Sequence, residues 1–582
     1  MEKFCSLIHS LGELPLGEYT FAQLYCALIR FLLPVLALII LIRCARSLIT
    51  FRKEPEIWGW LHLPDGNALP ITHWENVIGR HRRSDIIIDL PYISRSHAVI
   101  TRYDDGSWTV SDIGGKGGVK VNGESISIRA IEAGDVISLN GLEMVLEPIS
   151  HSQEAYQTTL RTKAGSDFHP GLTLMLLTVF QVFMTLQLLF TAHPENLHHI
   201  TIGFGALILI QWLLFAFYCA IRRKGYETEI IAFFLSTLGM AIIATAAPSE
   251  TVKQLLAIGM GLAIFLFIGW SLRDLERAKK IRYLAAAAGL ALLAFNLVFG
   301  EERFGAKNWI MIGSFSFQPS ELVKLCFIYT GASTLDRIVT KRNMLLFIVY
   351  SGLICGCLAL MNDFGTAIIF LAAFAVIAYL RSGNFATIAL LGSAGGFAGV
   401  MALRFLKPHV LRRFSSWRHV WEVPLDGGYQ QTRAMMCIAS GGLLGLGGGN
   451  GWLKFVAASD TDLVFATVSE EWGLLMAVFM TMSVIILVAF VVRSAGQGRS
   501  SFYTISACTA VTFLTVQTIL NVLGTVDVLP LTGVTFPFVS NGGSSMISAW
   551  GMLAFIKAAD TRQNASFAIR LPTRHYEEAD DE

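Results

Sequence analysis

The fold of this chain is decided by residues 305–325, which read GAKNWIMIGSFSFQPSELVKL. The stretch places Gln318, Glu321 and Lys324 at the start of an apolar helical run. Charged side chains at membrane depth are costly and usually face an internal cavity. Glu321 and Lys324 are three residues apart, hence on one helical face, where they can form an ion pair. The sequence leaves open whether this pair closes two helices or takes part in binding.

The composition indicates an integral membrane protein that also carries some soluble mass. Of its 582 residues, 53% are hydrophobic and 15% are charged. The formal net charge of +2 gives no indication of a nucleic-acid partner. The nine cysteines form no C-x-x-C pair and no metal-ligand spacing, which favours buried, reduced thiols.

About thirteen apolar runs approach the length of about 20 residues that a helix needs to cross a bilayer. They fall near residues 24–42, 171–192, 200–221, 228–247, 254–271, 283–300, 319–336, 344–361, 363–381, 386–405, 466–492, 502–523 and 537–556. Basic residues follow alternate runs, and such loops stay cytoplasmic. The sequence therefore predicts a polytopic α-helical membrane protein with its N-terminus outside and an uncleaved anchor in residues 1–54. Loops at 301–318, 406–465 and 524–536 are expected on the outer face.

Residues 55–150 have a different character from the rest of the chain. Short alternating runs such as DIIID and SWTVSD are separated by Gly, Asp and Asn turns. This pattern predicts a small all-β domain on the cytoplasmic side, inserted after the first helix. A polar linker at 151–170 follows it.

The β domain contains IGRHRRSDIIIDLPYISRSH at 78–97 and VNG at 121–123. These pieces resemble the forkhead-associated (FHA) family, β-sandwiches whose loops bind phosphothreonine peptides. The resemblance implies that Arg80, Ser94 and Arg95 hold the phosphate, and that His97 braces the loop. The chain reads GKGG at 115–118, where the family usually has S-x-N-G. An FHA scaffold that no longer binds phosphate is therefore the alternative.

Three further stretches place polar residues beside apolar runs. Asp363 in MNDFGTAIIF opens a helix, where it can serve as an N-cap. The outer segment 412–471 contains WEVPLDGGYQ, then a glycine-rich stretch whose context does not fit a dinucleotide site. The stretch LPLTGVTFPFVSNGGSS at 529–545 breaks the approach to the last helix, and such backbone needs protein or a water-filled cavity beside it.

The motifs NWIMIGSFSFQPSELVKL, TDLVFATVSEEWG and LPLTGVTFPFVSNGGSS follow one another in this order. Together they resemble the SEDS family (shape, elongation, division and sporulation), the FtsW/RodA/SpoVE proteins, over about residues 228–556. The resemblance implies a ten-helix core at 226–558 and a cytoplasmic tail at 559–582. Two helices in 171–225 and the anchor with its FHA domain are then additions.

The resemblance also implies an activity. Members polymerise lipid II, the undecaprenyl-diphosphate-linked disaccharide peptide, outside the bacterial cytoplasmic membrane, in division, elongation or sporulation. They work with a class B penicillin-binding protein, which supplies transpeptidation. Such an inverting glycosyltransferase needs a carboxylate base for the sugar hydroxyl. The leaving diphosphate needs cationic or metal stabilisation, so Mg²⁺ or Mn²⁺ is the candidate cofactor.

The catalytic base is expected in WEVPLDGGYQ at 421–430. Aligning this stretch with the family places Val423 where the family has its proposed aspartate. Asp426 is the nearest replacement and Glu422 is the second candidate. The alternative is that both are solvated loop acids and that transferase activity has been lost.

The same resemblance supplies the predicted substrate-binding residues. Arg413 and Lys324 are the candidates for the diphosphate, whereas Asp462 and Glu471 are expected to shape the cavity. The complete set is Gln318, Glu321, Lys324, Trp309, Asp363, Arg413, Gln430, Asp462, Glu471, Ser540 and Ser544. Asp460 and Asn541 are two further departures, because the family often has His and Tyr at these positions.

Two other classes of function stay open at the level of sequence. A flippase for a lipid-linked precursor predicts polar residues along a path through the helices and no essential outer carboxylate. A non-catalytic scaffold predicts that only the FHA domain and the helix surfaces matter. The outer acids and broken helices favour the polymerase.

Overall fold

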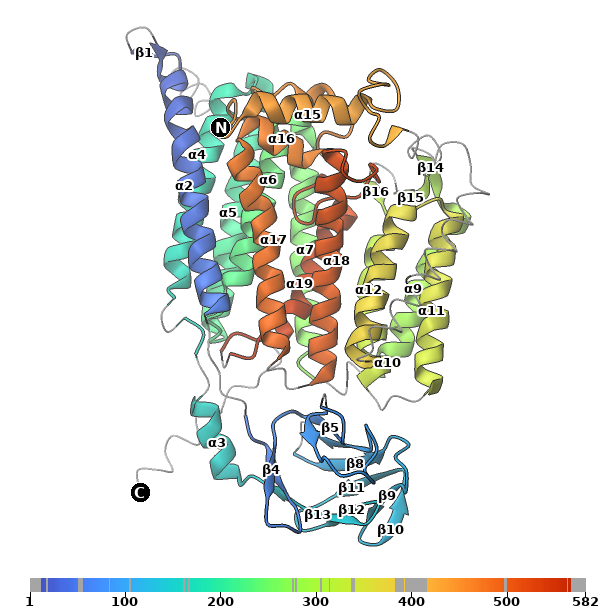
Figure 1. Cartoon of the computed structure of the whole chain (residues 1–582). Coiled ribbons are helices and arrows are strands. Elements are labelled where there is room, and N and C mark those ends of the chain that lie inside the picture. Colours follow the sequence, from blue (N-terminus) through green and yellow to red (C-terminus); the bar gives the residue numbers. More distant parts are fainter. Residues whose placement is uncertain are drawn as a thin grey trace, which may run out of the picture.

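The computed structural model describes residues 12–16, 19–50, 56–82, 84–103, 106–160, 163–165, 168–274, 277, 280–303, 306–312, 315–336, 341–382, 392, 416–496, 500–562 and 564–566. A bundle of long helices forms one body, and a β-sandwich lies at one end of it (Figure 1). We call this end of the bundle the domain end. At the opposite end, the loop end, lie three strands and two short helices (Figure 1). They are β14 (Glu301–Arg303), β15 (Ala306–Ile312), β16 (Phe315–Phe317), α15 (Tyr429–Gly441) and α16 (Val464–Glu471).

The long helices are α2 (Phe21–Ile49), α4 (Pro170–Thr191), α5 (Leu197–Ala220), α6 (Glu227–Ala246), α7 (Thr251–Ser271), α9 (Arg282–Phe299), α10 (Pro319–Asp336), α11 (Lys341–Leu360), α12 (Phe364–Ser382), α17 (Leu474–Ala495), α18 (Ser501–Thr525) and α19 (Gly543–Ala558). Within the described part of the chain, nine helical segments are long and apolar enough to cross a membrane. The predicted run at 386–405 lies outside the described residues, apart from Gly392. The other predicted runs fall on these helices, which confirms the polytopic α-helical class.

The predicted run at 466–492 is wrong as a single helix. The chain forms α16 (Val464–Glu471), turns, and starts α17 at Leu474. Gly473 between them has a φ of 91°, and a side chain there would overlap the carbonyl of Leu443. Position 473 requires a glycine because its backbone lies in the left-handed region and because another segment of the chain packs against it. The last predicted run is also shorter, because Phe538 has a φ of 63°, outside the helical region, and the helix begins only at Gly543.

The helix at the centre of the bundle is α6, in which 89% of the apolar stretch that could span a membrane is buried. Its neighbours include α7 and α19, which lie close together because Gly261 on α7 faces the ring of Trp550 on α19. That ring also meets Phe233 and Phe538 in edge-to-face contacts. The additional helices α2 and α4 pack on α17 and α6, so they are part of the same body as the rest of the bundle.

The all-β prediction for residues 55–150 is confirmed. One sheet has the strand order β10-β9-β12-β13-β3-β4 and the other β11-β8-β7-β5-β6. The strands are β3 (Gly59–His62), β4 (Ala68–Ile71), β5 (Glu75–Gly79), β6 (Ile86–Ile87), β7 (Ala98–Arg102), β8 (Trp108–Asp112), β9 (Val119–Val121), β10 (Glu124–Ile126), β11 (Ile128–Ile131), β12 (Val136–Leu139) and β13 (Leu142–Pro148). Asn122-Gly123 and Asn140-Gly141 turn two of its hairpins with positive φ at both residues, the geometry that favours Asn-Gly.

The predicted linker after the sandwich and the predicted tail after the last helix both differ from expectation. The predicted linker contains a helix, α3 (His151–Leu160), which Arg102 of the sandwich contacts through an ion pair to Glu154. Beyond α19, the described residues 559–562 and 564–566 pack into the domain end rather than leave it, and Asp560, Arg562 and Ser566 are buried. The packed body therefore extends past the predicted start of the tail at 559.

Candidate functional site

The first polar cluster at the loop end gathers three of the predicted residues from distant parts of the chain. Asp363 precedes α12, and its Oδ1 accepts the backbone N–H of Thr366 at 3.1 Å, so it caps the helix. Its Oδ2 accepts hydrogen bonds from the side chains of Gln318 at 3.3 Å and Asn308 at 3.0 Å. The backbone N–H of Gln318 donates to Ser544 Oγ at 3.2 Å. The starts of α10, α12 and α19 therefore meet at this cluster.

Sequence reasoning missed Asn308, which lies on β15 (Ala306–Ile312) beside the predicted Trp309. The signal was an amide in the same motif as Gln318. Trp309 itself is half-buried and pairs across the sheet with Glu301 of β14 (Glu301–Arg303). The strand β16 (Phe315–Phe317) completes this small sheet, and Gln318 follows it directly. The sheet thus positions both amides against Asp363.

Glu321 and Lys324 form the predicted pair, with 2.7 Å between Lys324 Nζ and Glu321 Oε1. The side chain of Lys324 is 0% exposed, and Glu321 also accepts a hydrogen bond from Ser548 of α19 at 2.8 Å. This is the geometry of an ion pair that closes α10 onto α19. The ammonium of Lys324 faces the carboxylate and no solvent, so its role toward a diphosphate stays a prediction.

The loop 457–463 and the loop 536–542 are joined by hydrogen bonds. Ser540 Oγ donates to the carbonyl of Thr461, and Asn541 donates to Asp460 from both its backbone N–H (2.7 Å, to the carbonyl) and its side chain (2.8 Å, to Oδ2). The two positions at which the chain departs from the family pattern therefore contact each other. Asp462 contributes its carbonyl, which accepts the side-chain amide of Asn521 of α18 at 3.0 Å.

The stretch WEVPLDGGYQ forms a chain of turns that ends in α15 (Tyr429–Gly441). Glu422 is exposed, and its carboxylate lies 3.0 Å from His419 Nδ1. Asp426 is exposed too, and within the described residues its carboxylate has no hydrogen-bond partner. Val423 is 39% exposed at the position expected for the family's aspartate. Of the two predicted bases, Asp426 is therefore the one not engaged by a described neighbour.

This loop is held in place by the segment that follows α18 (Ser501–Thr525). Trp417 Nε1 donates to the carbonyl of Val528 at 3.2 Å, and the backbone N–H of Arg418 donates to Asp527 Oδ1 at 3.2 Å. Gln430 donates to the carbonyl of Ala457 at 2.9 Å, which connects the start of α15 to the loop that carries Asp460 and Asp462. Arg413 lies outside the described residues.

Glu471 is buried at the end of α16, ahead of the spanning segment that begins at Leu474. Its Oε2 accepts the backbone N–H of Gly449 at 3.0 Å, and the neighbouring Glu470 accepts the backbone N–H groups of Trp452 and Leu453. Burial raises the pKa of Glu471 to about 7. The two glutamates thus hold the glycine-rich loop from inside.

The additional helices hold the same glycine-rich loop from outside. Arg30 on α2 donates to the carbonyl of Leu446, and Gln187 on α4 lies beside Gly448 of the loop and accepts the indole N–H of Trp472, after α16, at 3.1 Å. Sequence reasoning treated α2 and α4 as separate additions. Both contribute to the position of a loop at the candidate site.

In the β-sandwich, the predicted phosphate residues converge at the loops that follow β5, β6 and β8. Arg80 and Arg95 are exposed, and Arg80 Nη1 donates to the carbonyl of Pro91 at 3.2 Å. Ser94 Oγ accepts the backbone N–H of Lys116 at 2.8 Å, which leaves its own hydroxyl hydrogen available. His97 is buried between the two loops, where it accepts the N–H of Ser94 and lies 3.2 Å from the carbonyl of Gly118.

No group of three or more His, Cys, Asp and Glu side chains among the described residues could hold a metal ion. The expectation of Mg²⁺ or Mn²⁺ as a cofactor stays a prediction.

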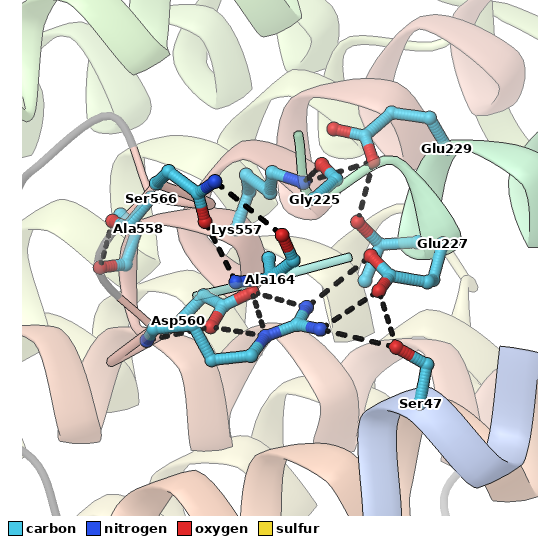
Figure 2. A network of polar contacts seen from close by, with 12 residues as sticks. Ser47, Ala164, Gly225, Glu227, Glu229, Lys557, Ala558, Asp560 and Ser566 are labelled. Atoms are coloured by element: carbon cyan, nitrogen blue, oxygen red, sulfur yellow. Dashed lines mark hydrogen bonds and ion pairs between the residues drawn. The ribbon is translucent and has the colours of Figure 1, made fainter. Parts of the chain in front are cut away.

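At the domain end lies a second, fully buried charge network that sequence reasoning did not identify (Figure 2). Arg562 lies 2.7 Å from both Glu227 and Asp560, and Ser47 of α2 donates to Glu227 at 2.6 Å. Lys557 pairs with Glu229 at 3.1 Å. The only local signal was a pair of acids at the start of an apolar run and a basic residue after the last one.

Asn564 extends this network to the other connection of the β-sandwich. Its side chain accepts the backbone N–H of Ala164 at 2.7 Å and donates to the carbonyl of Ala164 at 3.3 Å. Lys557 donates to the carbonyl of Gly225, so the turn before α6 is held as well (Figure 2). Because every charge here has a partner of opposite sign, the network is structural.

The comparisons with known proteins agree with this arrangement. The family model for the cell cycle proteins FtsW, RodA and SpoVE matches residues 230–565, and the FHA domain model matches residues 76–140. The peptidoglycan glycosyltransferase RodA of Mycobacterium tuberculosis (strain ATCC 25618 / H37Rv) is 29% identical over 325 residues, which cover 52% of this chain and 69% of the relative. Stage V sporulation protein E of Bacillus subtilis (strain 168) is 28% identical over 356 residues, which cover 56% of this chain and 94% of the relative.

A chain of a solved peptidoglycan synthase complex, in which polymerization and crosslinking are coordinated, is 26% identical with a TM-score of 0.49, covering 57% of this chain and 96% of that one. Since the family model matches more than half of the chain, the protein belongs to the FtsW/RodA/SpoVE family of cell cycle proteins and carries an FHA domain in addition.

Proposed function

We propose that this protein is a peptidoglycan glycosyltransferase that polymerises lipid II into β-1,4-linked glycan strands. The observation that carries the proposal is the family match over 230–565, together with relatives that are named as peptidoglycan glycosyltransferases. The polar clusters at the loop end support it, because they lie within the matched residues 230–565. The proposed activity would serve cell division, elongation or sporulation, the three processes associated with the named relatives.

The loop end is the outer face in this proposal, and the β-sandwich and the residues after α19 are cytoplasmic. Support comes from the basic residues that follow alternate helices, and from the positions of α15 and the β-sandwich at opposite ends of the bundle (Figure 1). The substrate's undecaprenyl chain would lie in the bilayer, with its diphosphate and sugars at the loop end.

Asp426 is the proposed base, and Glu422 is the second candidate. The carboxylate takes the proton of the sugar 4-hydroxyl while that oxygen bonds to the anomeric carbon of the second substrate. The bond from this carbon to the diphosphate breaks with inversion, and undecaprenyl diphosphate leaves. An exposed carboxylate without a described partner suits this task, because it can reach a substrate without breaking a contact of the fold.

The other predicted residues are proposed to contact the substrate or to fix loops at the loop end. Gln318, Asp363 and Ser544 form one connected cluster that can present polar groups to the sugars or the diphosphate. Ser540, Asp462 and Glu471 fix other loops at the loop end. The proposal that Arg413 stabilises the diphosphate rests on the sequence alone.

Two partners belong to the proposal. A class B penicillin-binding protein would crosslink the strands, in line with the solved synthase complex that one part of the chain is similar to. A protein carrying phosphothreonine would bind the FHA domain at Arg80, Ser94 and Arg95, and in this way recruit or regulate the synthase.

The test is polymerisation of labelled lipid II by the purified full-length protein with its transpeptidase partner, followed by gel analysis of the strands. Wild type should produce long strands, and Asp426→Ala should not. Val423→Asp is the informative companion, because it restores an acid at the family's usual position and should rescue Asp426→Ala. Full activity of both Asp426→Ala and Glu422→Ala would make the base assignment wrong. Transport of lipid II across vesicles without any polymer would favour a flippase, and neither activity would favour a scaffold.

A further inference from the structure

The loop 115–118 of the FHA domain has glycines at positions 115 and 117, and at both positions a side chain from elsewhere in the domain occupies the space of the absent one. Gly115 lies against His97, whose ring occupies the space of a side chain at position 115. Gly117 has a φ of 88°, and a Cβ there would overlap the carboxamide of Asn140. Asn140 therefore stands where a side chain of residue 117 would stand.

The position of Asn140 is fixed by two local features. It is the first residue of the Asn-Gly turn between β12 and β13, with a φ of 48°. Its Nδ2 donates to the carbonyl of Tyr92 at 3.0 Å, in the loop that also carries Ser94 and Arg95. The carboxamide thus bridges from its own hairpin to the loops of the predicted phosphate site.

This placement leaves hydrogen-bonding capacity on an exposed group. A carboxamide has two N–H donors and one oxygen with two lone pairs, and only one N–H is used by Tyr92. The residue is exposed, and Lys116 and Gly117 beside it are exposed as well. One N–H donor of this exposed residue therefore has no described partner, and the carboxamide oxygen lies against Gly117 without a hydrogen bond, in the loop whose Lys116 N–H donates to Ser94.

We propose that Asn140 is a ligand-contacting residue of the FHA domain, whose carboxamide hydrogen-bonds the main chain of a bound phosphothreonine peptide in place of a side chain at Gly117. This proposal rests on the proposed phosphopeptide function of the domain. Arg80, Arg95 and Ser94 hold the phosphate, and Asn140 holds the peptide backbone beside it. The site then has a carboxamide beside the phosphate residues although position 117 is a glycine.

The test uses the full-length protein in detergent and a phosphothreonine peptide selected on wild type from a degenerate library. The variant is Asn140→Gly, because glycine keeps the positive φ of the turn and removes only the carboxamide. The matched control is Asn122→Gly, at the equivalent position of the other Asn-Gly turn. Binding should weaken by about five- to tenfold in Asn140→Gly, as expected for one or two hydrogen bonds, and stay within about twofold in the control.

A second measurement separates contact from a purely structural effect. Peptides that are N-methylated at single backbone positions lose one N–H each. One such position should weaken wild-type binding by about tenfold and Asn140→Gly binding by less than about twofold, because the partner is already absent. Equal losses in both proteins, or wild-type affinity in Asn140→Gly, would overturn the assignment of Asn140 and leave the phosphopeptide function intact. No binding of any phosphothreonine peptide by wild type, with Arg80→Ala unchanged, would overturn both.

Discussion

At the domain end of the bundle, Glu227 and Glu229 are fully buried and paired with Arg562 and Lys557, whereas Glu422 and Asp426 at the loop end are exposed. A buried charge without a partner would cost several kcal/mol of stability, so Glu227 and Glu229 serve to stabilise the fold through their ion pairs. An exposed carboxylate costs the fold almost nothing to keep or to lose. The difference separates acids that are available for chemistry from acids that hold helices together.

The largest effect is expected for Asp426→Asn, which removes the base and keeps the shape of the side chain. Polymerisation of lipid II should fall by about 10²–10⁴-fold, the usual contribution of a general base. The melting temperature should stay near that of wild type, because the exposed carboxylate has no described partner to lose. The comparison would be broken if Asp426→Asn lowered stability and left the polymerisation rate unchanged.

Arg562→Ala makes the opposite change at the domain end. It leaves Glu227 and Asp560 buried without their cation, which should cost about 3–5 kcal/mol of stability. Thermal unfolding of the detergent-solubilised protein measures this loss. Lys253→Ala is the matched control, since it removes a half-exposed pair with Glu250 and should cost less than about 1 kcal/mol. Similar melting temperatures for the two variants would contradict the structural role of the network.

The pair Glu321–Lys324 lies near the loop end but is buried like the pairs at the domain end. Lys324→Met alone should destabilise the protein by about 3 kcal/mol, because it strands the carboxylate of Glu321. Adding Glu321→Gln should restore most of that stability, as removal of both charges ends the mismatch. If the double variant is stable and still polymerises lipid II, the pair is structural. If it is stable and inactive, Lys324 has the binding role that the sequence left open.

Glu471 is also a buried acid that contributes to the stability of the fold, and because its pKa is raised this contribution depends on pH. Its pKa of about 7 lies above the ordinary value of 4.5, so the folded state prefers the protonated form. This contribution to stability is complete below pH 4.5 and is lost as the pH rises through 7. Melting temperature should therefore decline between about pH 5 and 8, by an amount equivalent to about 2–3 kcal/mol. Glu471→Gln should flatten that decline, and an unchanged slope would show that another group causes it.

The smallest effect is expected at Asp460 and Asn541, which contact each other across two loops of the site. Asp460→Ala and Asn541→Ala should each cost about 1 kcal/mol, whereas the double variant should cost little more than either alone. A double-mutant cycle in thermal unfolding measures the coupling. Additive losses would show that the two departures from the family pattern are independent.

The sequence predicted what local patterns can specify. Alternation and turn residues located the β-sandwich, and apolar runs located the long helices, because both depend on neighbours within one element. Pairing of Glu321 with Lys324 and capping by Asp363 were foreseen for the same reason. The break at Gly473 was not, since an apolar run continues across it, and only contact with Leu443 explains why the chain turns there.

The remaining contacts join residues that are far apart in the sequence. Glu227 meets Arg562 more than 300 positions later, and no periodicity announces such a pair. Asn308 was overlooked because its partner, Asp363, lies 55 positions later, just before α12. The relation between Asp460 and Asn541 appears only when two loops are brought together. Sequence patterns therefore predicted the elements and the motifs, while the selection of which charges are buried depends on the tertiary arrangement.

The buried network at the domain end has a consequence for how this protein could have been assembled. Ser47, near the end of α2, and Ala164, beyond α3, are both held by the segment after α19. The β-sandwich also has adjacent ends of its own, since β3 pairs with β13. A unit with adjacent ends thus joins the bundle at two points fixed by one segment, which is the arrangement that tolerates insertion or exchange of a whole domain. Another domain with neighbouring termini could therefore be placed at these two points of the bundle without rebuilding the helices.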